Sequence, residues 1–124
     1  MKTLEIQIKS REQADKEFAS VFNKARSGKK VPLQKGVYFT SLEAVRNLLT
    51  EKRLELLHLI RQHSPKSISE IAKISGRNFK NVHTDLKILQ SYGLVEINET
   101  KKVKNHLSQR IFIPYQAVNI HAWF

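Results

Sequence analysis

The sequence predicts an α+β fold that is mainly α. Two segments with helical apolar spacing are separated by Gly76, and two short alternating segments follow them. A polar, basic stretch joins the alternating segments. Helix, turn, helix and a two-stranded hairpin form the order of a winged helix-turn-helix. We expect three parts: a strand–helix extension at 1–40, the winged helix-turn-helix at 41–113, and a C-terminal strand at 114–124.

The N-terminal extension begins with an alternation of apolar and polar residues from Leu4 to Ile8, which predicts a strand with one buried face. Ser10 is placed to cap the helix that follows. That helix carries an amphipathic stripe, which Phe22 widens, and Gly28 ends it. The stripe consists of Ala14, Phe18, Val21 and Ala25.

The middle of the chain predicts a short helix capped by Ser41 and a second helix, capped by Thr50, from Glu51 to about His63. Apolar residues cover well over half of the second helix, so we expect it to be buried on more than one side. In a domain this small, the second side can be a partner subunit. These apolar residues are Leu54, Leu56, Leu57, Leu59 and Ile60.

The helix-turn-helix starts at Ser69, the expected cap of a helix that buries Ile71, Ala72 and Ile74 and breaks at Gly76. A longer helix is expected from about Asn78 to Ser91, ended by Gly93. Its core stripe has residues at i, i+3, i+7 and i+10. The members are Phe79, Val82, Leu86 and Leu89.

The composition is strongly basic, with 22 Lys+Arg against 11 Asp+Glu, a net charge of +11 and a pI of about 10.1. Such a balance favours a polyanionic partner, first nucleic acid and then an anionic membrane, over a basic surface kept only for solubility. There is no cysteine. The N-terminal alternation is unlike a signal peptide, and no stretch has the length of a membrane span. We expect a cytoplasmic protein without a membrane partner.

The outward face of the second helix carries residues suited to base edges. Asn can bind adenine through two hydrogen bonds, Arg can bind guanine, and Thr and His can reach edges or phosphates. Lys87 lies further along and is better placed for a phosphate. The ordinary alternative is an exposed helix surface. The expected recognition residues are Arg77, Asn78, Lys80, Asn81, His83, Thr84 and Lys87.

Two residues on this helix have open roles. Asn78 either contacts DNA or caps the helix. Asp85 would be repelled by phosphate, so it either orients Lys87 or Arg77 or faces away.

The hairpin predicts strands at Leu94–Ile97 and Arg110–Ile113, with a tip at 98–109. The tip has no acid from Lys101 onward, as contact with a DNA backbone or minor groove requires. A solvated tip is the alternative. The expected wing contacts are Lys101, Lys102, Lys104, His106 and Arg110.

The sequence shows no pattern that is typical of a catalytic site or a metal site. The five histidines lack carboxylate partners at metal-ligand spacing, and there is no nucleotide-binding glycine loop or nucleophile elbow. We expect no enzyme, metal or cofactor.

Several motifs resemble those of small prokaryotic winged-helix transcriptional regulators related to the MarR and ArsR superfamily. They are Leu49–Leu57, Ser67–Ala72, Gly76–Lys87, Tyr92–Glu96 and Ile113–Val118, and the resemblance covers nearly the whole chain. In that group an acid usually follows the tyrosine where this chain has Gln116. Many members are TumA-like antitoxins of small toxins. The resemblance implies a DNA-binding autorepressor that can also bind a toxin.

The sequence therefore predicts a dimeric repressor that binds a palindromic operator in double-stranded DNA, with a homodimer built on the Glu51–His63 helix or on the terminal strands. The terminal strands pair either within one chain or across the dimer. The rivals are an antitoxin that sequesters a small toxin protein, a protein-interaction module and a nuclease.

Overall fold

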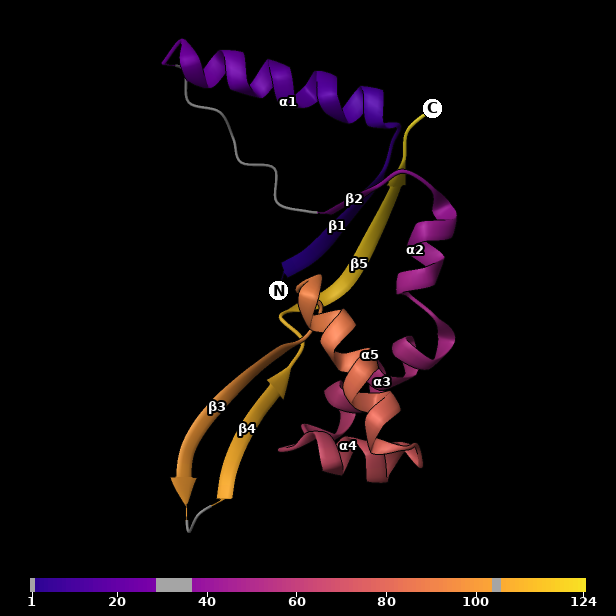
Figure 1. Cartoon of the computed structure of the whole chain (residues 1–124), viewed down its shortest axis with the longest axis vertical. Helices are drawn as coiled ribbons and strands as arrows, with labels where there is room; N and C mark the ends of the chain where they lie inside the picture. The colour runs from indigo at the N-terminus through magenta and orange to yellow at the C-terminus, as the bar shows by residue number, and fades with distance from the viewer. Residues whose placement is uncertain (1, 29–36, 104–105) are drawn as a thin grey trace. The chain divides into compact units, whose positions relative to one another are not determined.

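The structure is a computed structural model that describes residues 2–28, 37–103 and 106–124, with side chains described except at 99–103 and 106–108. It confirms the mainly helical α+β class (Figure 1). The elements are β1 (Lys2–Ile8), α1 (Arg11–Arg26), β2 (Val37–Phe39), α2 (Leu42–Leu48), α3 (Glu51–His63), α4 (Ile68–Ser75), α5 (Phe79–Ser91), β3 (Glu96–Val103), β4 (His106–Phe112) and β5 (Tyr115–Ala122). No helix in these ranges is long and apolar enough to cross a membrane.

The chain divides into two compact units. We call Asn47–Gln116 the helical unit, and Thr3–Arg46 together with Ala117–Phe124 the terminal unit. The sequence placed the start of the DNA-binding domain at residue 41, whereas the break between the units lies within α2. Both ends of the chain contribute to the terminal unit.

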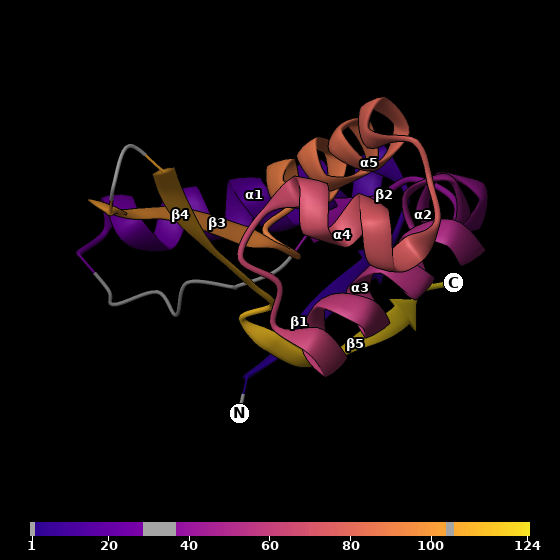
Figure 2. The same ribbon diagram turned by 90° about the horizontal axis from the view of Figure 1, so that it is seen from below.

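The helical unit is built on contacts among α3, α4 and α5, which Figure 2 shows gathered together. Thr50 caps α3 as predicted, since its hydroxyl accepts from the backbone N–H of Arg53. The apolar stripe of α5 is fully buried at Val82, Leu86 and Leu89. The other buried apolar residues described in this unit are Leu48, Leu56, Ile60, Ile68, Ile71, Ala72, Leu94, Val95 and Ile111.

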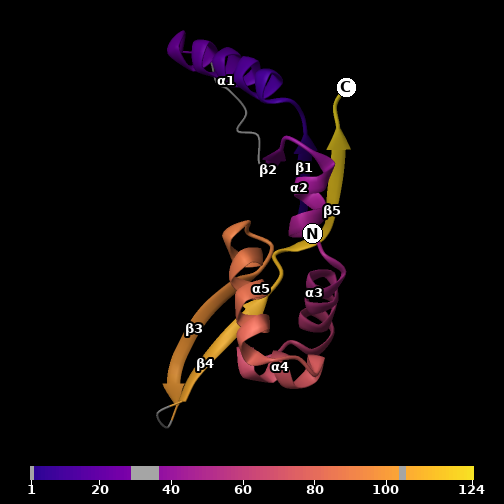
Figure 3. The ribbon, with the colours of Figure 1, turned by 45° about the vertical axis from the view of Figure 1, so that its right-hand side comes forward.

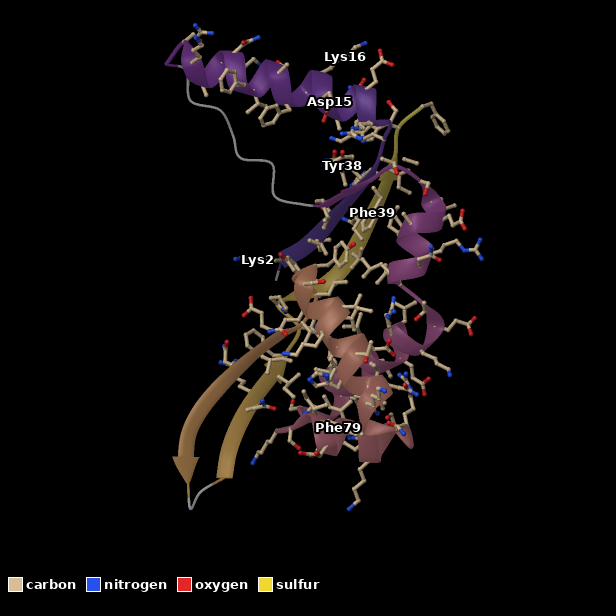
Figure 4. All side chains as sticks on the ribbon, viewed as in Figure 1. Lys2, Asp15, Lys16, Tyr38, Phe39 and Phe79 are labelled. Carbon is tan, nitrogen blue, oxygen red and sulfur yellow. The ribbon has the colours of Figure 1, made fainter. Side chains whose placement is uncertain are left out.

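Three local predictions in this unit are wrong. Phe79 and Ile74 were expected in the core, but both are exposed because they lie beside the turn, where the described residues leave them uncovered. Figure 4 labels Phe79 at the first turn of α5. The cap of α4 is Ser67 in place of Ser69: the Ser67 hydroxyl accepts from the backbone N–H of Glu70 at 3.0 Å.

Strands β3 and β4 pair antiparallel, with Glu96 opposite Phe112 and Val103 opposite His106 (Figure 3). The ladder is longer than predicted and takes in most of the stretch expected to form the tip. A backbone hydrogen bond of 3.1 Å from Gln109 to Lys66 ties β4 to the residue before the cap of α4. The hairpin thus follows the helix-turn-helix as a wing.

The terminal unit holds a sheet with strand order β2-β1-β5. β1 and β2 are parallel, with Ile6 opposite Val37. The contacts from Glu5 to His121 and from Ile8 to Trp123 rise together along β1 and β5, as they do in a parallel pair. The two terminal strands therefore pair within one chain, which answers the alternative left open by the sequence.

Candidate nucleic-acid interface

The turn between α4 and α5 is fixed by the residues at its two ends. Gly76 ends α4 in the left-handed region with φ of 68°, and its N–H donates to the carbonyl of Lys73. Asn78 caps α5, since its side-chain oxygen accepts from the N–H of Lys80 at 2.8 Å. The cap role of Asn78 is thus the one that the structure shows.

The outward face of α5 presents Lys80, Asn81, Thr84 and Lys87 to solvent, on the side opposite the buried stripe. The Asn81 side chain has no hydrogen bond among the described residues. The Thr84 hydroxyl donates to the carbonyl of Lys80 at 2.9 Å, which leaves its lone pairs available. His83 is half-buried and stacks on Phe79, with the ring centroids 5.9 Å apart.

Asp85 bridges three segments of the helical unit. Its carboxylate accepts from Arg77 Nη2 at 2.7 Å and from Arg53 Nε at 3.2 Å. Nη1 of Arg53 also donates to the carbonyls of Asn47 and Leu48 at the end of α2. Asp85 therefore ties α5 to the turn before it and, through Arg53, to the junction of α2 and α3.

The electrostatics of this bridge favour the ionised carboxylate. Burial alone would raise the pKa of Asp85, but the hydrogen bonds from Arg77 and Arg53, together with their positive charges, outweigh it and lower the pKa. The side chains of all three residues are less than one-fifth exposed. A carboxylate held between two guanidinium groups in this way acts as a structural link.

The bridge changes the setting of Arg77, which the sequence placed among the base-contacting residues. One of its terminal nitrogens is bonded to Asp85, and the other, Nη1, is buried without a hydrogen-bond partner in the described part of the chain. Of the two alternatives for Asp85, orientation of Arg77 is the one observed. Arg53 was not foreseen, because it lies 32 positions away and no local spacing connects it to Asp85.

An open pocket of about 590 Å³ lies beside this bridge, between the start of α3 and the outward face of α5. Asn81 and Thr84 form part of its lining, so two of the expected recognition residues border the pocket. The remaining lining residues come from the start of α3 and from the bridge: Thr50, Glu51, Lys52, Arg53, Arg77 and Asp85.

The expected wing residues are distributed along the hairpin. Lys101 and Lys102 lie on β3, and His106 begins β4, with side chains outside the described set, while Lys104 lies outside the described residues. Arg110 is exposed, and its guanidinium carbon lies 4.5 Å from the ring centroid of Phe112. That aromatic face steadies Arg110 on the hairpin.

Among the described residues, no three or more His, Asp or Glu side chains are grouped so that they could hold a metal ion. Of the predicted recognition residues, Lys80, Asn81, Thr84 and Lys87 lie exposed on α5. Asn78 caps the helix, His83 stacks on Phe79, and Arg77 is turned to Asp85.

Comparison with models of protein families matches residues 48–120 to the HVO_A0114 family. The match covers more than half of the chain and spans α3, α4, α5 and the hairpin. A search of curated proteins finds no match.

Proposed function

The chain belongs to the HVO_A0114 family, and we propose that it is a sequence-specific DNA-binding transcriptional regulator, a repressor that acts as a dimer in the cytoplasm. The proposal rests chiefly on the outward face of α5, where Asn81 and Thr84 are exposed on a helix that a turn and a wing accompany. In such an arrangement the second helix lies in the major groove. The resemblance to MarR- and ArsR-like regulators points to the same function.

The proposed reading edge consists of Lys80, Asn81 and Thr84, with His83 at its border. An amide at position 81 can bind adenine through two hydrogen bonds, and a hydroxyl at position 84 can bind a base edge or a phosphate. Arg77 is assigned a positioning role in place of base contact, because Asp85 holds its guanidinium. Lys87 and the wing cations bind phosphates.

The overall charge supports this partner. A net charge of +11 on 124 residues draws the protein to a polyanion and makes the binding depend strongly on salt. The wing adds Lys101, Lys102 and Arg110 on two adjacent strands. A protein-interaction module that does not bind DNA would show a salt slope near zero.

We expect Asn81→Ala and Thr84→Ala to lower the preference for the operator while binding to random DNA persists. Each lost base contact should reduce discrimination by about 1–3 kcal/mol. The operator is first obtained by selection of bound sequences from a random pool, and specific and random duplexes are then compared by gel-shift titration. Gln62→Ala, an exposed polar residue on α3, is the matched control. Unchanged sequence preference in both α5 variants would show that α5 is not the recognition helix.

A second candidate is an antitoxin that also neutralises a small toxin by direct binding and represses its own operon. The observation that favours it is the edge position of β5 in the sheet order β2-β1-β5. An edge strand offers unpaired backbone groups to a strand of another protein. Running the DNA selection with and without the product of the adjacent gene separates the two candidates, because a toxin would form a stable complex and alter repression.

A further inference from the structure

Among the described residues, α1 carries more exposed large apolar side chains than any other helix. Among the described residues none on α1 is buried: Phe18 is 72% exposed, Phe22 is 56% exposed and Val21 is 42% exposed. On α3, the helix that the sequence favoured for a dimer contact, Leu56 and Ile60 are buried and Leu54 is 49% exposed. Because the terminal strands pair inside one chain, we expect the helices to form the dimer contact. Of the described helices, α1 has the most exposed apolar side chains to bury there.

A helix in the position of α1 would normally cover a sheet. It connects the parallel strands β1 and β2, and such crossover helices pack on a face of the sheet. In Figures 1 and 3, α1 instead extends away from the end of β1 without lying across the strands. Within the described ranges, its apolar stripe therefore lacks the cover that this connection usually supplies.

The spacing of the stripe is that of a coiled-coil seam. Ala14, Phe18, Val21 and Ala25 follow one another at intervals of four, three and four, which are alternating d and a positions of a heptad. The position one heptad before Phe18 is Arg11. A seam of this kind faces another helix.

We propose that α1 pairs in antiparallel orientation with α1 of a second copy of this chain and so forms a dimer contact. In this register Phe18 packs against the partner's Val21, and Ala14 packs against the partner's Ala25. The two-fold axis passes near Ala19 and Ser20, and each pair occurs twice, as a symmetric interface requires. The inference rests on the proposed function in one respect: a regulator that acts as a dimer requires a contact between two copies of the chain.

Charge favours the antiparallel orientation. The seam is flanked by Glu17 and Lys24, which are one heptad apart, and the antiparallel register sets Glu17 beside the partner's Lys24 on both sides of the axis. In a parallel pair Arg11 would meet the partner's Arg11 inside the seam. In the antiparallel pair Arg11 lies beyond the end of the opposing helix and stays in solvent.

The contacts of α1 with its own strand leave this arrangement available. Lys9, which is buried, pairs with Glu17, and its hydrogen bond lowers the pKa of Glu17, so the glutamate carries its charge at neutral pH. The other carboxylate oxygen of Glu17 accepts from Gln13 at 3.2 Å. These bonds hold α1 at the end of β1, while Phe18 and Val21 remain exposed.

The oligomeric state tests the contact without DNA. By sedimentation equilibrium over a concentration series, the wild type should be dimeric and Phe18→Ser should weaken the dimer at least tenfold. Phe18 is exposed, so its loss should leave the circular dichroism spectrum unchanged. Leu54→Ser, which removes a partly exposed apolar residue from α3, is the control and should leave the dimer intact. A monomeric wild type, or a dimer lost in Leu54→Ser and kept in Phe18→Ser, would overturn the proposal.

The orientation is tested with cysteines, because the chain has none of its own. Ala14→Cys and Ala25→Cys are prepared separately with tags of different size, mixed and oxidised. The antiparallel pair predicts a disulfide between the two different variants, with little cross-linking of either alone. Ala14→Cys that cross-links with itself would show a parallel pair and contradict the proposal. Since neither assay contains DNA, a failure here leaves the gel-shift result for Asn81 and Thr84 to stand or fall separately.

Discussion

At the scale of single residues, Asp85 shows how an acid can fit on the proposed recognition helix. The carboxylate does not face the expected phosphates alone, because Arg77 and Arg53 hold it on the side toward α3. The same bridge withdraws Arg77 from the set of free side chains. In the proposed interface, this leaves the exposed residues of α5 as the candidates for base contact.

We expect Asp85→Asn to lower the free energy of unfolding by about 2 kcal/mol near neutral pH, because charged hydrogen bonds to both arginines are lost. The pKa of Asp85 is lowered in the folded state, so its contribution is fully present above the ordinary value of 3.8 and disappears as the pH falls through the lower, folded value. The gap between variant and wild type should therefore close in acid. Urea unfolding between neutral and acidic pH measures it.

The control for this change is Glu12→Gln, which removes an exposed carboxylate paired with Lys16 at 3.4 Å. Exposed pairs of this type contribute little, so the stability should barely change. If Asp85→Asn is as stable as Glu12→Gln at neutral pH, the bridge does not hold the helical unit together.

At the scale of elements, α4 begins two residues earlier than the sequence indicated, because its N-cap residue is Ser67 and not Ser69. Ser67 and Ser69 both precede apolar residues at helical spacing, so either can serve as a cap on sequence grounds. The structure selects Ser67, and the Glu70 carboxylate in turn accepts a hydrogen bond of 3.0 Å from the backbone N–H of Lys66. Reciprocal bonds of this kind resemble a capping box.

We expect Ser67→Ala to destabilise the helical unit by about 1 kcal/mol, since an N-terminal N–H of α4 loses its partner. Ser69→Ala is the matched control: the same side chain is removed from an exposed position inside the first turn, and stability should hold. Thermal unfolding of the two variants gives the comparison. Equal losses, or a larger loss for Ser69→Ala, would contradict the assignment of the cap.

At the scale of the whole molecule, the proposed function divides the work: we expect the excess of positive charge to set the general affinity for DNA, and the outward face of α5 to set the preference among sequences. The two contributions are separable, because phosphate contacts act on every sequence alike. The hairpin residues Lys101 and Lys102 belong to the first kind in the proposed complex.

We expect the double variant Lys101→Ala with Lys102→Ala to weaken binding to operator and random DNA by similar factors. Each lost phosphate contact should also reduce the slope of log affinity against log salt by about 0.9. Gel-shift or anisotropy titrations at several salt concentrations measure the slope. Lys2→Ala with Lys16→Ala, which removes the same charge from exposed positions in β1 and α1, is the control. A selective loss for the operator would show that the wing reads sequence.

Much of the fold could be predicted because its signals are local. Apolar periodicity indicated α3 and α5. Thr50 marked the start of α3, Gly76 the end of α4 and Gly93 the end of α5, since caps and left-handed turns depend on neighbouring residues. The order of helix, turn, helix and hairpin followed from these signals. The outward residues of α5 followed too, because a helix with one buried stripe exposes the opposite face.

Only the tertiary structure decided the rest. The pairing of β1 with β5, the bridge from Asp85 to Arg53 and the exposure of Phe18 and Phe79 all depend on residues far apart in the chain. A periodic pattern shows which residues could share a face, but burial also needs a second surface to cover that face. For Val82 the surface is present, and for Phe18 the described part of the chain does not supply it.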